Sequence, residues 1–251
     1  MIIKYLPSNP KLRAFVERAL EFVQRVYKDR LLARLEFVAF SIRDPRDVEE
    51  AEKLGVRFAL SHYDSRRARV VVVEGPKTDA FGLFTSTAQE VTHHVLHGPR
   101  IRQKVIKALL RDVPALATEI PARRLGSSER LGLAWLMEEL HAKYIVHNYF
   151  VKLNDKPVPV SQEPELIDEY KSAFEHLELV NMLTRIPAII KVTKILEDEM
   201  ARKRNPFANF TATVHEMFAG AIKRFPVEVY NSNPSRYKIL YSRQSIHELP
   251  L

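Results

Sequence analysis

Apolar and polar positions in the first part of the chain follow the helical period and the strand period in turn. Apolar residues at helical spacing follow Asn9-Pro10, which is typical of a helix start, and continue to about residue 26. Residues 34–42 alternate and are rich in β-formers, so we expect a strand there. Asp44-Pro45 then predicts the N-cap and the first position of a short helix.

Two further strands and a second long helix are predicted next. Val56–His62 and Ala68–Glu74 carry the strand pattern, and the segment between them is expected to turn a hairpin. The later strand is apolar on both faces, as in a strand that is covered on both sides. Thr78 or Asp79 can cap the helix that follows, and Gly98-Pro99 is typical of its end.

The second half of the chain is predicted to be mainly helical. A long helix that Ser127 or Ser128 opens and that runs to Phe150 is apolar nearly all round, so we expect it to be buried. Its acidic pair Glu138-Glu139 is conspicuous, because an unpaired buried carboxylate is costly. The other expected elements are helices at 100–110, 164–179, 187–204 and 207–224 and a strand pair at 227–230 and 237–241.

These patterns together predict an α+β fold that is mostly helical and contains a small sheet. We expect an α+β core at 1–153 and a helical C-terminal region at 164–251, which are separated by a proline-rich segment. The two regions can still pack as one domain.

Composition narrows the class of protein. Hydrophobic residues make up 46% of the chain and charged residues 28%, which is typical of a globular protein. No apolar run reaches the roughly 18 residues of a membrane span, and the N-terminus lacks a secretory signal pattern, so we expect a cytoplasmic protein with no membrane partner. The chain has no cysteine, so any metal must be held by His, Asp, Glu or a neutral oxygen. Few glycines and abundant Lys, Arg and Glu favour a thermophilic source.

The net charge of +8 leaves room for an acidic partner such as nucleic acid. The basic residues are scattered, however, and they are not interleaved with aromatic residues as in a platform for single strands. Nucleic-acid binding is therefore an alternative function and not the main prediction.

The densest candidate chemistry lies in residues 85–98, with the sequence TSTAQEVTHHVLHG. Three of the chain's nine histidines fall within five consecutive positions, namely His93, His94 and His97. On a helix, Gln89 would share a stripe with His93 and His97, and Glu90 would share an overlapping one with His94 and His97. Such a polar cluster among valines and leucines indicates chemistry more than packing.

The segment Gln89–His93, QEVTH, resembles the active-site motif of the zincin metallopeptidases, specifically of the gluzincin branch. In that motif two histidines four residues apart bind zinc, and the glutamate between them faces the metal-bound water. The hairpin before the helix and the helix-ending Gly98 also resemble this family. Glu139, on a downstream helix, resembles its third ligand. The resemblance covers about residues 34–150.

The resemblance implies a zinc site with defined roles. His93 and Glu139 would be zinc ligands, with Glu138 as the alternative to Glu139, and Glu90 would be the general base. Gln89 stands where the family has its first histidine, and a neutral amide oxygen is a poorer zinc ligand than an imidazole nitrogen. This departure is expected to weaken metal binding unless another side chain replaces Gln89.

Three arrangements remain open at this point. In the first, His97 replaces Gln89, and His94 then occupies the position of the base. In the second, Glu90, His94 and His97 hold the metal. In the third, no metal binds, and the scaffold serves as a non-catalytic protein-binding module.

A second kind of metal site is suggested by two Glu-x-x-His pairs on separate helices, which resemble those of ferritin-like di-iron bundles. The pairs are Glu90 with His93 and Glu138 with His141, and Glu175 or Glu216 could supply a further ligand. The helix that should precede the first pair is missing, because a strand is predicted there.

The expected function is therefore zinc-dependent hydrolysis of a peptide or protein, with Glu90 taking a proton from water. The strand Ala68–Glu74 is a candidate edge with which an extended substrate pairs. His147 or Tyr144 could stabilise an oxyanion, although core packing is the more usual role for such a tyrosine.

Overall fold

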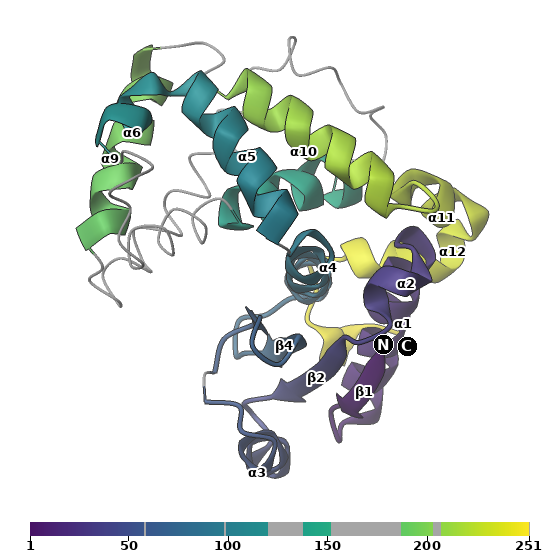
Figure 1. The fold of residues 1–251 in the computed structure, drawn as a ribbon. Helices are drawn as coiled ribbons and strands as arrows, with labels where there is room; N and C mark the ends of the chain where they lie inside the picture. Colours follow the sequence, from purple (N-terminus) through teal and green to yellow (C-terminus); the bar gives the residue numbers. More distant parts are fainter. Residues whose placement is uncertain (58, 98, 120–137, 152–186, 203–206, 251) are drawn as a thin grey trace. The chain divides into compact units, whose positions relative to one another are not determined.

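The computed structural model describes residues 1–57, 59–97, 99–119, 138–151, 187–202 and 207–250 (Figure 1). These residues belong to two compact units. The first unit contains Met1–Val95, 148–151 and 221–250, and the second contains the described residues between 96 and 147 and between 187 and 220. The predicted helix at 164–179, the proline-rich segment, and the helix start at Ser127 or Ser128 lie outside the described residues.

A four-stranded mixed sheet with the order β1-β2-β4-β3 is the centre of the first unit. The strands are β1 (Ile2–Tyr5), β2 (Glu36–Ser41), β3 (His62–Asp64) and β4 (Arg69–Glu74). β1, β2 and β4 run parallel, and β3 pairs antiparallel with β4 as a hairpin. The expected α+β fold with a small sheet is confirmed.

The helices of the first unit surround this sheet and extend to the C-terminal end of the described chain. They are α1 (Pro10–Val26), α2 (Asp29–Leu32), α3 (Pro45–Lys53), α4 (Ala80–Leu96), α11 (Pro226–Ser232), α12 (Pro234–Tyr237), and the short 3-10 helices η3 (Lys238–Tyr241) and η4 (Ile246–Glu248). The predicted helix starts are confirmed, because the Asn9 side chain accepts a hydrogen bond from Leu12 N and the Asp44 side chain accepts one from Arg46 N.

Both faces of the sheet are covered. On one face Val38, Phe40, Val71 and Val73 form a buried cluster with Ala51 of α3. Successive side chains of a strand point to opposite faces, so the alternate residues of β2 and β4 point to the other side. Figure 1 shows α4 on that side of β4, opposite α3. The apolar run of β4 is buried throughout, which confirms the prediction of a strand covered on both sides.

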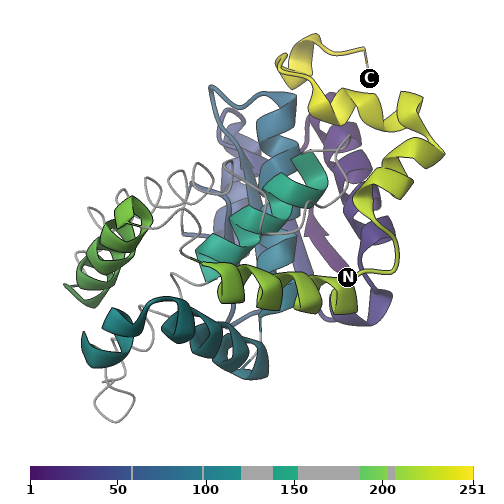
Figure 2. The same ribbon diagram turned by 90° about the horizontal axis from the view of Figure 1, so that it is seen from above.

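The C-terminal segment of the first unit packs along α1. α11 and η4 contact α1, and Figure 2 shows the yellow C-terminal segment beside the purple α1. Lys28 N donates to Ala221 O at 3.1 Å, and an isolated antiparallel bridge joins Tyr27 to Ile222. Residues that are farthest apart in the sequence are thus neighbours in one core.

Three predictions about strands are wrong. The strand predicted at Ala68–Glu74 is not an edge, because β4 lies between β2 and β3, and the outer strands are β1 and β3. The strand pair predicted at 227–230 and 237–241 is helical, since Pro226 and Pro234 occupy first helical positions in α11 and α12. The strand expected at Val56–His62 begins only at His62.

The second unit is helical in its described part. Its elements are α5 (Pro99–Asp112), α6 (Pro114–Glu119), a helical segment at 138–145, α9 (Pro187–Arg202) and α10 (Ala208–Ala221). The segment at 138–145 continues into the π-helix η1 (Val146–Val151), whose residues from 148 onward belong to the first unit. Asp112 accepts hydrogen bonds from Asn209 N at 3.0 Å and Phe210 N at 2.7 Å, so the end of α5 caps the start of α10. Between Glu138 and Tyr144 only Lys143 is not buried, which confirms the expected buried helix over this range.

Candidate metal centre

The helix α4 carries the histidine cluster and is the next element after β4. Hydrogen bonds hold the first turn of α4 in place. Asp79 Oδ1 accepts a hydrogen bond from Gly82 N at 2.6 Å, so Asp79 is the cap. Ala80 N donates to Gln244 O at 3.0 Å, which satisfies another amide of the first turn. The start of α4 is therefore held both by its own cap and by the C-terminal segment.

Glu90 and His93 lie one turn apart on α4, and both are buried. Glu90 is 7% exposed and His93 is 4% exposed, whereas Gln89 is half-buried. Burying a carboxylate and an imidazole is unfavourable unless each is paired or bound to a ligand. The two residues that best match the zincin motif are thus both buried on α4, where Thr87 and Thr92 are buried as well.

His94 has a structural role in the first unit. Its Nδ1 hydrogen-bonds with the Tyr63 hydroxyl at 3.1 Å, and its Nε2 is 2.9 Å from Leu31 O. A carbonyl only accepts, so Nε2 carries a hydrogen and donates to Leu31 O, and in the neutral ring Nδ1 then accepts from the tyrosine. Both nitrogens are engaged, so the structure argues against the metal set Glu90, His94 and His97, and against His94 as a base.

His97 belongs to the second unit, where it pairs with Glu138. His97 Nδ1 lies 2.8 Å from Glu138 Oε1, and the Glu138 side chain is 8% exposed. A carboxylate on one imidazole nitrogen fixes the orientation of the ring, as it does for many metal-bound histidines. Glu138 therefore acts on His97 in this structure, which leaves Glu139 as the better candidate for the third ligand.

Glu139 and His141 are buried on the same helical segment as Glu138. Glu139 is 9% exposed and His141 is 2% exposed. The di-iron alternative gains no support, because β4 and not a helix precedes α4, Glu216 is exposed on α10, and Glu175 lies outside the described residues.

The hydroxyl of Tyr144 is engaged in the second unit by His215 of α10. The Tyr144 hydroxyl hydrogen-bonds with His215 Nε2, and the two rings are perpendicular at a centroid distance of 5.2 Å. Burial lowers the pKa of His215, so the neutral ring accepts and the tyrosine donates. This contact supports packing as the role of Tyr144 and not stabilisation of an oxyanion.

The predicted zinc ligands come from both compact units. Gln89 and His93 are in the first, together with the proposed base Glu90, and His97 and Glu139 are in the second. Within the described parts of the chain, no group of three or more His, Asp or Glu side chains is arranged to hold a metal ion. Imidazole and carboxylate are nevertheless suitable zinc donors, so the residue types fit a divalent cation chemically. The joint site of His93 and Glu139 stays a prediction.

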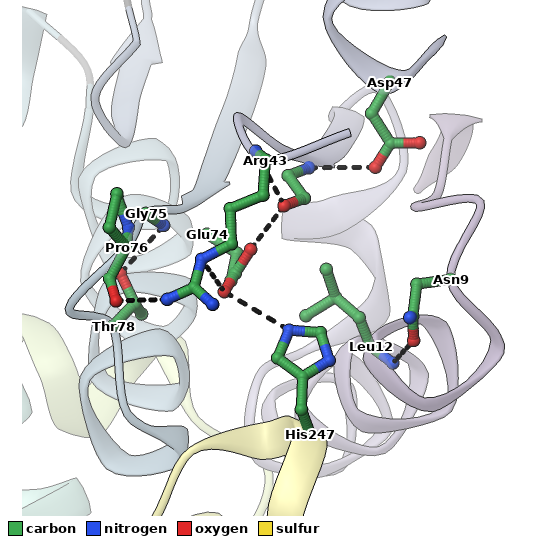
Figure 3. A network of polar contacts seen from close by, with 10 residues as sticks. Asn9, Leu12, Arg43, Asp47, Glu74, Gly75, Pro76, Thr78 and His247 are labelled. Atoms are coloured by element: carbon green, nitrogen blue, oxygen red, sulfur yellow. Dashed lines mark hydrogen bonds and ion pairs between the residues drawn. The ribbon is translucent and has the colours of Figure 1, made fainter. Parts of the chain in front are cut away.

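A polar cluster that the sequence analysis missed lies at the carboxyl ends of β2 and β4 (Figure 3). Glu74, only 2% exposed, accepts a hydrogen bond from the Ser41 hydroxyl and lies 3.5 Å from Arg43 Nε and 3.6 Å from His247 Nε2. Asp47 accepts from Ser41 N at 2.9 Å. The Ser41 hydroxyl donates to the Glu74 carboxylate and not to the His247 imidazole. The cluster therefore connects the ends of β2 and β4 to the C-terminal segment through Glu74. The one signal in the sequence is a glutamate that ends an apolar strand.

Comparison with known proteins assigns no family. No family model matches the chain, and neither the curated proteins nor the solved structures contain a match. In the described part of the chain, no helix combines the length and the apolar character that a membrane crossing requires.

Proposed function

We propose that the chain is a zinc-dependent hydrolase of the zincin type, which acts on a peptide or protein in the cytoplasm. One observation carries the proposal. The helix α4, directly after the β3–β4 hairpin, buries both Glu90 and His93 one turn apart. A carboxylate and an imidazole at this spacing are the base and a ligand of the motif that the sequence resembles.

His93 and Glu139 would hold the metal, with His97 or Gln89 as the third protein ligand. When bound, zinc supplies Lewis acidity that polarises a substrate carbonyl and acidifies water. Glu90 would act as the general base, with a carboxylate that can accept a proton from water and pass it to a leaving amine. Low exposure of Glu90 favours this role, because removal from bulk water strengthens interactions with its charge.

The metal content of protein purified without an affinity tag tests the proposal most directly. We expect one zinc ion per chain by mass spectrometry, and loss of that zinc in His93→Ala. His94→Ala is the matched control, because both His94 nitrogens are engaged by the first unit, so it should keep zinc and lower the melting temperature. The proposal would be refuted if the protein binds no zinc and its melting temperature is the same with and without a chelator.

Glu90→Gln separates catalysis from metal binding. The variant should retain zinc and lose about 10²–10⁴-fold in hydrolysis of a fluorogenic peptide, because an amide cannot accept the proton. Unchanged hydrolysis in this variant would remove Glu90 from the mechanism.

A second candidate function is a non-catalytic module on the same scaffold. It is favoured by Gln89, whose neutral amide is a poor zinc ligand in the position of the family's first histidine. Gln89→His distinguishes the two functions. Restoring the missing ligand should raise zinc affinity by about two orders of magnitude in a zincin-type site, with a parallel gain in hydrolysis. A gain in zinc affinity without any hydrolysis would favour the module.

A further inference from the structure

The first unit contains a hollow that none of the predicted zinc ligands line. Its volume is about 650 Å³, and its walls come from α1, α11, α12, η3 and the residues after η4. Volumes of about 300–1,000 Å³ are typical of small-molecule sites. Every residue that lines it is described and belongs to the first unit.

Two cationic side chains line this hollow, Arg18 of α1 and Lys238 of η3, and no acidic residue does. Within the described residues neither has an ion-pair or hydrogen-bond partner for its charged group. Several other basic residues of α1 and of the C-terminal segment are engaged. These are Arg13 with Glu17, Arg25 with the Tyr237 hydroxyl, Arg236 with Glu21, and Arg243 with Asp79. The charged groups of Arg18 and Lys238 are therefore available to an external anion in the hollow.

The rest of the lining is mainly apolar and aromatic. Tyr230 and Tyr241 contribute rings, which meet edge to face at a centroid distance of 5.6 Å, and Ile239 and Leu249 contribute aliphatic surface. Two contacts hold Tyr241 in place. Its hydroxyl donates to Phe150 O at 2.7 Å, and its ring packs on the Phe84 ring at a centroid distance of 5.2 Å. Because the Tyr241 side chain is already ordered, less conformational entropy is lost when a ligand binds against it.

We propose that this hollow binds a small anionic amphiphile, a molecule with one carboxylate, sulfonate or phosphate head and an apolar or aromatic body. The head lies between Arg18 and Lys238, where charge-assisted hydrogen bonds hold it. The body lies against Tyr230, Tyr241, Ile239 and Leu249, where apolar surface leaves water. This site is independent of the proposed zinc chemistry on α4.

Two dyes with the same aromatic body test the charge requirement. The probe is 8-anilinonaphthalene-1-sulfonate, and its neutral counterpart is N-phenyl-1-naphthylamine, which lacks the sulfonate. We expect the full-length protein to bind one sulfonate dye per chain, at least about tenfold more tightly than the neutral dye, and salt to weaken only the former. Dodecanoate should displace the sulfonate dye, because it carries the same combination of head and body.

Variants of the two cations locate the site. Arg18→Gln and Lys238→Gln should each weaken binding of the sulfonate dye by about tenfold and leave the neutral dye unaffected. Arg13→Gln is the matched control on the same helix, since Arg13 pairs with Glu17 and does not line the hollow. Unchanged affinity for the sulfonate dye in the double variant, or equal affinity for the two dyes in the parent protein, would overturn the proposal. His93→Ala should leave dye binding intact, so the test does not depend on the zinc site.

Discussion

Asp112 shows how one side chain can organise a helix far along the chain. It is buried, and its carboxylate accepts two backbone amides at the start of α10 and the side-chain amide of Asn209 at 2.7 Å. Asp112→Ala removes these acceptors, so we expect a loss of about 1–2 kcal/mol in the free energy of unfolding. Denaturant titration measures it. Asp198→Ala, an exposed aspartate on α9, is the control and should change stability by less than about 0.5 kcal/mol. Equal effects of the two substitutions would contradict the capping role.

A second residue-scale prediction concerns pH and the ion pair between β2 and β4. Arg69 Nη2 lies 2.7 Å from Glu36 Oε2, and this hydrogen bond lowers the pKa of Glu36. The folded state therefore binds the proton less tightly than the unfolded state. The stabilisation is fully present above the unfolded pKa of glutamate and is lost as the pH falls through the lower folded pKa.

Glu36→Gln tests this sign. We expect the variant to be less stable than the parent by about 0.5–1 kcal/mol near neutral pH, since the pair is partly screened by solvent, and the difference to vanish in strong acid. Melting temperatures across the acid range measure the difference. The control is Glu17→Gln, which removes one partner of the exposed ion pair with Arg13. This variant should change the melting temperature little at any pH. If the difference in stability between Glu36→Gln and the parent grows toward acid pH, the pKa of Glu36 is not lowered in the folded state.

At the scale of elements, the position of α4 depends on contacts that its own sequence does not reveal. His94 connects α4 to β3 through Tyr63 and to the end of α2 through Leu31 O. Tyr63→Phe and His94→Ala should therefore be coupled in stability. A double-mutant cycle is expected to give a coupling energy of about 1 kcal/mol. Additive effects would show that the hydrogen bond contributes nothing to holding α4.

The elements that the sequence predicted correctly are those with strong local signals. Asn9 and Asp44 cap their helices as expected, and Asp79 is the cap of α4 from the two candidates Thr78 and Asp79. β1 was missed because it has four residues, and Ile2 and Ile3 are both half-exposed, so the pattern carries little signal. The edge prediction for β4 was wrong because strand order depends on tertiary pairing, which a strand's own residues do not encode.

The candidate site was predictable only in part, for a similar reason. The sequence placed Glu90 and His93 on one helix among valines and leucines, and the structure buries both. The engagement of His94 depends on Tyr63 and Leu31, which are remote in the sequence. The spacing of the histidines in the sequence predicts which of them share a helix face. It does not predict the hydrogen-bond partners of each ring nitrogen, because those partners come from other elements.

At the scale of the whole molecule, the first unit is completed by residues from the opposite end of the chain. Ala80 N and Phe81 N, at the start of α4, donate to Gln244 O at 3.0 Å and Ser242 O at 2.9 Å. Tyr237 is fully buried, and its ring meets Phe22 of α1 edge to face at 5.0 Å. The sheet, α1 and α4 therefore cannot complete their core without residues 221–250.

A chain that ends at residue 220 should consequently fail to form the first unit, although all four strands remain. Truncation exposes the aromatic core around Phe22 and leaves two amides of α4 without their carbonyl acceptors, and together these losses exceed the few kcal/mol by which a domain is stable. We expect the truncated chain to lose the cooperative thermal transition of the first unit, and partial recovery when residues 221–251 are added as a separate peptide. Arg236→Gln in the full chain is the control, because it breaks only an exposed ion pair of the same segment and should cost less than about 1 kcal/mol. If the truncated chain instead melts cooperatively at the parent temperature, the C-terminal segment is an appendage and the division of the chain into these two units is wrong.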